Sequence, residues 1–91
     1  MGWKVYDEAV EMQGLRHNYL PQLFRWRGRL YDVDSVERCW TTGRRRYFRA
    51  QCGPGVFELY QDLGLGTWHL RRVRLAAARV VAVRRFAPAW R

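Results

Sequence analysis

The stretch RYFRAQCGPGVFELYQ, residues 46–61, decides the fold of this 91-residue chain. Apolar and polar side chains alternate on both sides of a Gly-Pro-Gly segment, and a period of two is typical of β-strands. With that segment as the turn, Phe48 faces Leu59 and Ala50 faces Phe57 on one side of a hairpin. The stretch therefore predicts two antiparallel strands whose apolar side chains share a core.

A third strand, residues 67–73, is predicted after a glycine-rich turn. Alternation in this strand places Trp68 opposite Leu59 and Leu70 opposite Phe57. All three strands then have their apolar side chains on the same side. This agreement predicts a three-stranded antiparallel meander.

A second hairpin is predicted upstream, with strands over residues 23–26 and 29–36. Gly28 supplies the positive φ that the tight turn between them needs. The pairing gives this hairpin a core side with four apolar residues, Phe24, Trp26, Tyr31 and Val33. The next apolar positions after Val33 are Val36 and Trp40, and the step of three residues to Val36 breaks the alternation. This predicts a β-bulge near residues 34–35.

Together these segments predict a mostly β domain, a small antiparallel meander of about five strands rolled into an SH3-like or open barrel. A chain of this length supports one core, so residues 1–91 are expected to form a single domain. Residues 1–20 are expected to contribute a short strand and a loop. The meander then covers residues 21–74, and residues 75–91 form a basic C-terminal extension.

Basic charge is concentrated in the second half of the chain. Residues 1–43 carry six basic and six acidic side chains, whereas residues 44–91 carry eleven arginines and only Glu58 and Asp62 as acids. Codon usage can account for arginine in place of lysine, but it does not account for the loss of acidic residues. The asymmetry predicts a polyanionic partner, which is nucleic acid, an anionic membrane surface or an acidic protein.

The side of the meander that the core does not use is predicted to be basic and aromatic. Its cross-strand rows are Arg49–Glu58–His69, Tyr47–Tyr60–Thr67 and Gln51–Val56–Arg71. Proteins that bind single-stranded nucleic acid combine a positive track with aromatic platforms on which bases stack. We therefore expect six residues to bind nucleic acid: Arg45, Tyr47, Arg49, Tyr60, His69 and Arg71. The alternative is a solvated sheet face, with arginines for solubility and tyrosines for β-propensity.

The sequence contains no motif for catalysis or metal binding. Ser35 is the one serine, His17 and His69 are the two histidines, and none lies in a nucleophile motif. Opposite charges that face each other across a sheet are ordinary pairs, so we interpret the row with Glu58 as a surface ion-pair row. The two cysteines lack metal-ligand spacing and are expected to be reduced. A noncatalytic protein without metal, cofactor or small-molecule substrate is predicted.

The C-terminal extension offers a second binding surface. Its alanines at residues 76–78 favour helix and its β-branched residues at 79–86 favour strand, so both structures stay open for it. Because Trp and Arg are enriched at protein-binding hot spots, a protein partner is expected at four residues, Arg84, Arg85, Phe86 and Trp90. Packing of Trp90 back onto the core is the alternative.

The chain is expected to be cytoplasmic and to have no membrane partner. Its N-terminus lacks an apolar signal segment. No apolar run approaches the roughly 20 residues that cross a bilayer.

Four motifs resemble an uncharacterised bacterial domain family that occurs beside, or fused to, homologues of Y-family translesion DNA polymerases. The motifs are Phe24-Arg-Trp-Arg-Gly-Arg-Leu-Tyr31, Tyr47-Phe-Arg49, Val56-Phe-Glu-Leu-Tyr-Gln-Asp62 and Gly66-Thr-Trp-His-Leu70. The resemblance covers residues 20–74 and implies an accessory role near DNA repair, by context alone. It brings no catalytic residues with it.

Two hypotheses follow from the sequence. The first is a noncatalytic module that binds nucleic acid, with single-stranded or distorted DNA favoured. The second is an adaptor that engages a DNA polymerase or another repair protein through residues 75–91.

Overall fold

The computed structural model describes residues 2–75, which form one antiparallel sheet. Its strands are β1 (Lys4–Arg16), β2 (Leu20–Trp26), β3 (Arg29–Asp32), β4 (Ser35–Thr42), β5 (Arg45–Cys52), β6 (Gly55–Asp62) and β7 (Trp68–Leu75). Their order across the sheet is β3-β2-β1-β7-β6-β5-β4, and no helix occurs in this part of the chain. The prediction of a mostly antiparallel β domain is confirmed, with seven strands in place of about five.

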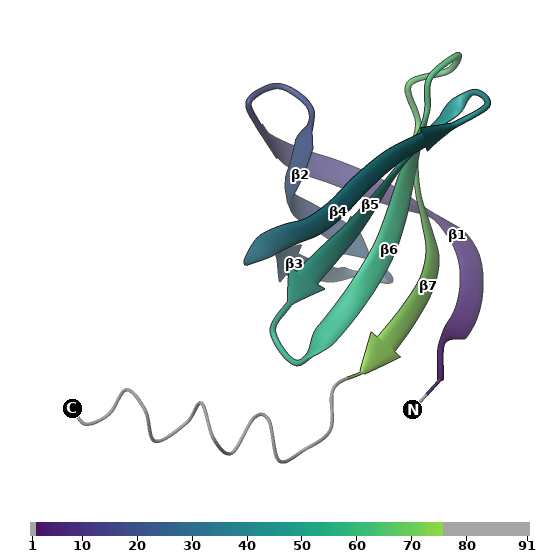
Figure 1. Cartoon of the computed structure of the whole chain (residues 1–91). Coiled ribbons are helices and arrows are strands. Elements are labelled where there is room, and N and C mark those ends of the chain that lie inside the picture. The colour runs from purple at the N-terminus through teal and green to yellow at the C-terminus, as the bar shows by residue number, and fades with distance from the viewer. Residues whose placement is uncertain (1, 76–91) are drawn as a thin grey trace.

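β1 is the strand that rolls the sheet. Its residues 4–10 pair with β7, whereas residues 11–16 pair with β2. A register shift between Val5 and Glu8, where Asp7 has a φ of 54°, marks a bulge of the kind that bends a strand. Figure 1 shows β1 curving away from β7 and passing behind the sheet toward β2. The result is an open half-barrel with β3 and β4 as its two edges.

Two predicted segments are organised differently in the structure. The expected loop before residue 21 is a three-residue turn, because His17 and Asn18 take left-handed φ values of 55° and 68° and let β1 and β2 pair almost to their ends. The expected strand over 29–36 is divided into β3 and β4. At the division the amide of Val33 donates to Gln22 of β2, and the amide of Asp34 donates to Gln51 of β5.

The core lies inside the roll, between the β2–β3 hairpin and strands β5–β7. The ring of Phe57 lies 5.8 Å from that of Phe24, 6.2 Å from that of Trp26 and 5.0 Å from that of Tyr31, measured between centroids. Each large ring removes roughly 150 to 250 Å² from water, so this cluster supplies much of the burial. The expected core residues of the meander are buried too, namely Phe48, Ala50, Leu59, Trp68 and Leu70.

The β2–β3 turn at Arg27 and Gly28 is confirmed, with φ values of 52° and 79°. It is fastened to β1, since Arg27 forms an ion pair with Glu8 at 2.5 Å and the indole of Trp26 donates to Glu8 at 2.9 Å. These hydrogen bonds, first from Arg27 and then from Trp26, lower the pKa of Glu8. The hairpin is thereby held over the core.

The register of β5 with β6 is as predicted, but that of β6 with β7 is not. Leu70 lies opposite Leu59, and Val73 lies opposite Phe57. The expected partners, Trp68 and Leu70, are displaced because residues 63–67 form a loop before β7 begins. A register shift between residues 58 and 59 then leaves Arg71 as the extra residue of a β-bulge.

The predicted C-terminal extension lies outside the described residues except for Leu75, the last residue of β7. Residues 2–75 include no helix that could cross a lipid bilayer.

Candidate nucleic-acid interface

We call the side of β4–β7 that points away from the core the outer face. It carries Arg38 and Trp40 from β4, Arg45, Tyr47 and Arg49 from β5, Glu58 and Tyr60 from β6, and His69, Arg71, Arg72 and Arg74 from β7. The structure brings all six predicted site residues onto this face. Their neighbours differ from the predicted ones. The loop before β7 pairs His69 with Tyr60, and the bulge in β7 then pairs Arg72 with Glu58 and Arg74 with Val56.

Four rings form a continuous row across the outer face, which we call the aromatic row. Trp40, Tyr47, Tyr60 and His69 lie opposite one another on successive strands. Their neighbouring centroids are 5.3, 5.4 and 4.8 Å apart, and the first and last pairs are stacked at 8° and 18°. Cross-strand pairs of this kind stabilise a sheet.

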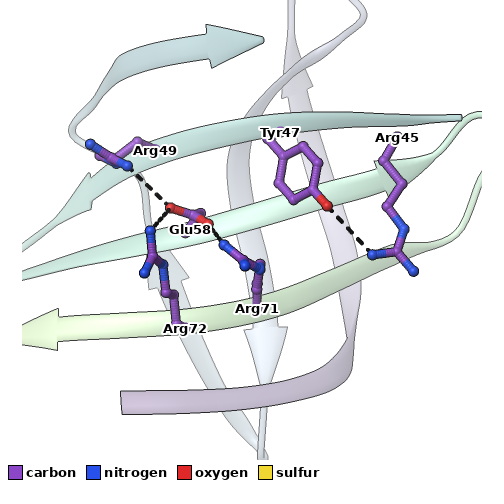
Figure 2. Close-up of polar contacts among 6 residues, drawn as sticks. All are labelled: Arg45, Tyr47, Arg49, Glu58, Arg71 and Arg72. Atoms are coloured by element: carbon purple, nitrogen blue, oxygen red, sulfur yellow. Dashed lines mark hydrogen bonds and ion pairs between the residues drawn. The ribbon is translucent and has the colours of Figure 1, made fainter. Parts of the chain in front are cut away.

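Beside the aromatic row, three guanidinium groups converge on the carboxylate of Glu58, as Figure 2 shows. Arg71 donates to Oε2 at 2.5 Å, whereas Arg72 and Arg49 donate to Oε1 at 3.2 Å and 3.3 Å. We call Arg49, Arg71 and Arg72 the arginine cluster. The bulge at Arg71 allows two consecutive residues of β7 to reach the same carboxylate.

Glu58 was expected in a surface ion-pair row, but its side chain is fully buried. Burial alone would raise the pKa of this carboxyl, and the hydrogen bonds from Arg71, Arg72 and Arg49 outweigh it and lower the pKa. Glu58 is therefore ionised at neutral pH. It was also expected to face His69, but Arg72 occupies that position.

Trp3 covers one end of the arginine cluster. The guanidinium carbons of Arg72, Arg74 and Arg49 lie 4.3, 4.8 and 5.3 Å from the centroid of its ring. Cations over an aromatic face are attracted by the ring quadrupole, so the indole orders these side chains. Residue 3 precedes β1, yet it reaches the outer face because β1 pairs with β7.

Arg45 is ordered by the aromatic row. Its guanidinium donates to the hydroxyl of Tyr47 at 3.4 Å and lies 4.3 Å from the centroid of Tyr60, and Figure 2 shows the contact with Tyr47. The hydrogen bond to Tyr47 is the main reason that the pKa of Arg45 is raised. Asp7, at the β1 margin, adds to this effect.

Five residues at the outer face are absent from the predicted rows and from the six expected site residues: Trp3, Arg38, Trp40, Arg72 and Arg74. The bulge at Arg71 turns Arg72 and Arg74 outward. Trp40 was treated as part of an apolar series. A register shift between Val36 and Arg38 turns it to the outer face instead. The expected bulge near residues 34–35 therefore lies further along the chain. A two-residue turn at 43–44 predicts the observed pairing of Trp40 with Tyr47, whereas no signal in the sequence assigns Trp3 to this face.

A concavity of the described part lies away from the outer face, at the end of the half-barrel. This pocket of about 1030 Å³ is lined by aromatic and apolar side chains, such as Trp26 and Phe57, and also by charged ones, namely Lys4, Arg29, Asp32 and Asp34. Neither Glu58 nor His69 borders it. Within residues 2–75 no three His, Cys, Asp or Glu side chains gather where they could hold a metal ion.

The four predicted partner-binding residues, Arg84, Arg85, Phe86 and Trp90, lie outside the described residues. Comparison of the chain with protein-family models, with curated proteins and with solved structures finds no match in any of the three.

Proposed function

We propose that this chain is a noncatalytic nucleic-acid-binding module that contacts its partner through the outer face. One observation carries the proposal, namely that six arginines lie on this face and its one central carboxylate is buried beneath three of them. Asp7 and Asp62 lie at the margins, and Asp62 already accepts hydrogen bonds from the amides of Gly64 and Leu65. Positive charge therefore strongly exceeds negative charge on the outer face.

The arginine cluster has more donors than its carboxylate can use. Each guanidinium offers five N–H donors, whereas a carboxylate has about four lone-pair sites. The Nε groups of Arg49 and Arg72 are buried and have no partner among the described residues. Arg71 is half-exposed while it holds Glu58, so its remaining donors face solvent. Guanidinium donors match phosphate oxygens in geometry and charge.

The arginines are also held in place before any partner arrives. Trp3 orders one end of the cluster, and Tyr47 with Tyr60 orders Arg45. Ordering a long side chain on binding costs about 0.5 to 1.5 kcal/mol, which these contacts reduce. Preorganised arginines on one face support binding to a polyanion.

Titration of labelled single-stranded and double-stranded oligonucleotides of equal length, at 50 and 200 mM salt, tests this proposal. Phosphate contacts produce steep salt dependence, so binding should weaken sharply at the higher salt. Arg45→Ala should weaken it further. Arg29→Ala is the matched control, because this exposed arginine lies on β3, at the far edge of the sheet. Absence of binding at 50 mM salt would overturn the proposal.

A link to DNA repair or translesion synthesis is part of the same proposal and rests on the family resemblance alone. Single-stranded or distorted DNA is the favoured partner, and the two oligonucleotide forms in the titration distinguish it from intact duplex. An adaptor role through residues 75–91 is the second proposal. A pull-down with and without these residues tests it, since identical partners in both samples would exclude a role for the extension.

A further inference from the structure

The rings of the aromatic row turn their faces toward one another, which decides what they can offer a ligand. Tyr47 lies between Trp40 and Tyr60, and Tyr60 lies between Tyr47 and His69. Tyr60 is only 5% exposed and also has Arg45 over its ring. The two inner rings thus have neighbours on both sides.

The remaining large rings of the outer face are occupied by arginines. Arg38 and Arg49 lie 5.1 and 5.6 Å from the ring centroid of Trp40, at the outer end of the row. Trp3 has three guanidinium groups within 5.3 Å of its ring. Stacking of a nucleic-acid base needs an open ring face, so these aromatic side chains are poor platforms.

The most exposed side chains of the outer face are arginines, whereas the rings of Trp40, Tyr47 and His69 are partly buried. Arg38, Arg45 and Arg71 are exposed, and the side chains of Arg49 and Arg72 are about a quarter exposed. The rings and Glu58 lie beneath or between these side chains. The aromatic row therefore acts as a support for arginines, in contrast to the stacking role expected from the sequence.

Resting on the proposed function, we propose that the outer face recognises the phosphodiester backbone and makes no stacking contact with the bases. Backbone contacts fix position on a nucleic acid but carry no direct sequence information. The ligand class is then any accessible run of phosphodiesters, whatever its bases. Arg45 and Arg71 are the residues that contact phosphate most directly.

An abasic oligomer separates this mode from base stacking. The full chain is titrated with a labelled 20-mer of deoxythymidine and with a 20-mer of the same backbone in which tetrahydrofuran replaces every base, both at 50 mM salt. Backbone recognition predicts dissociation constants within about twofold and the same salt dependence for both probes. Even one stacked base would weaken binding of the abasic probe about five- to 150-fold.

Variants sharpen the comparison. Arg71→Ala should weaken both probes by the same factor and reduce the salt slope by about one. Arg29→Ala should leave both unchanged, and circular dichroism checks that each variant is folded. A deoxythymidine probe that binds more than fivefold more tightly than the abasic probe overturns backbone recognition and leaves the proposed function standing. Failure of both probes to bind overturns the proposed function itself.

Discussion

Arg71 and Arg72 are consecutive in the sequence, yet both donate to the carboxylate of Glu58, at 2.5 Å and 3.2 Å. Consecutive residues of a regular strand point to opposite faces of a sheet. The bulge in β7 removes that constraint, because Leu70 and Val73 keep their places in the core while both intervening arginines turn outward. One extra residue thus allows two consecutive arginines of β7 to donate to a single buried carboxylate.

Replacement of this carboxylate should reveal its contribution to stability. We expect Glu58→Gln to lower the free energy of unfolding by about 2 kcal/mol at pH 7, because the arginines lose a charged acceptor but remain partly hydrated. Chemical denaturation measures the difference. Glu11→Gln is the control, because this exposed residue forms a long, solvent-exposed ion pair with Arg25 at 3.6 Å. The substitution should change the free energy of unfolding by no more than about 0.5 kcal/mol.

The stability difference between the wild-type protein and Glu58→Gln should depend on pH. The pKa of Glu58 is lower in the folded chain than in the unfolded chain, so its contribution is present above the unfolded pKa, about 4.3, and is lost as the pH falls through the folded pKa. The wild-type protein and Glu58→Gln should therefore converge in stability toward pH 3. An unchanged gap between them at pH 3 and pH 7 would contradict this assignment.

Tyr60 should matter for its ring and not for its hydroxyl. The ring is buried between Tyr47 and His69, so Tyr60→Ala should cost about 3 kcal/mol, as truncation of a buried aromatic ring does. Tyr60→Phe keeps the ring and should cost less than about 1 kcal/mol. Thermal unfolding followed by circular dichroism separates the two variants. Equal losses in both would mean that the hydroxyl carries the contribution.

The two cysteines should differ in reactivity. Cys39 is exposed, whereas Cys52 is buried and burial raises the pKa of its thiol to about 12. Because the thiolate is the reactive form, one thiol per chain should react with a disulfide reagent at pH 8, and two should react in denaturant. The variant Cys39→Ala should show no fast-reacting thiol. A rapid reaction of the native Cys39→Ala protein would show that Cys52 is accessible.

Gly28 should be required for its backbone conformation alone. Its φ is 79°, and a Cβ at this position meets nothing within 4 Å, so Gly28→Ala should cost about 1 kcal/mol through backbone strain. Gly28→Asn should cost less, since asparagine adopts positive φ more readily. Gly2→Ala serves as the control, because Gly2 also has open space but no positive φ. Denaturation midpoints of the three variants test the order.

Regular pairing was predictable from the sequence, and irregular pairing was not. Alternation in residues 46–61 predicts the contact of Phe48 with Leu59, because neither strand of this hairpin contains a bulge. The length of the loop before β7 and the bulge at Arg71 have no signal in composition. The predicted row placed His69 opposite Glu58, but the loop sets His69 opposite Tyr60, and the bulge then sets Arg72 opposite Glu58. A shift of one residue at such a point exchanges every neighbour beyond it.

In the candidate site, too, the residues in regularly paired strands were predictable and those placed by irregular pairing were not. Alternation correctly places Tyr47, Arg49 and Tyr60 on one side of the sheet, away from the core. The burial of the Glu58 side chain was not predicted, because this burial depends on two neighbours, Arg71 and Arg72, that only the bulge brings together. Trp3 was missed because its position depends on the pairing of β1 with β7, a contact between the two ends of the described chain.

That pairing also has a consequence for the order of assembly. In the described chain it is the one hydrogen-bonded strand pairing between segments distant in sequence, since every other paired strand is a hairpin neighbour. Local contacts close first because short loops cost less entropy. We therefore expect β1–β3 and β4–β7 to form as separate units and to join late. The aromatic row and the arginine cluster belong wholly to the second unit, so the outer face takes shape before the barrel is rolled, and only Trp3 is added when the two units meet.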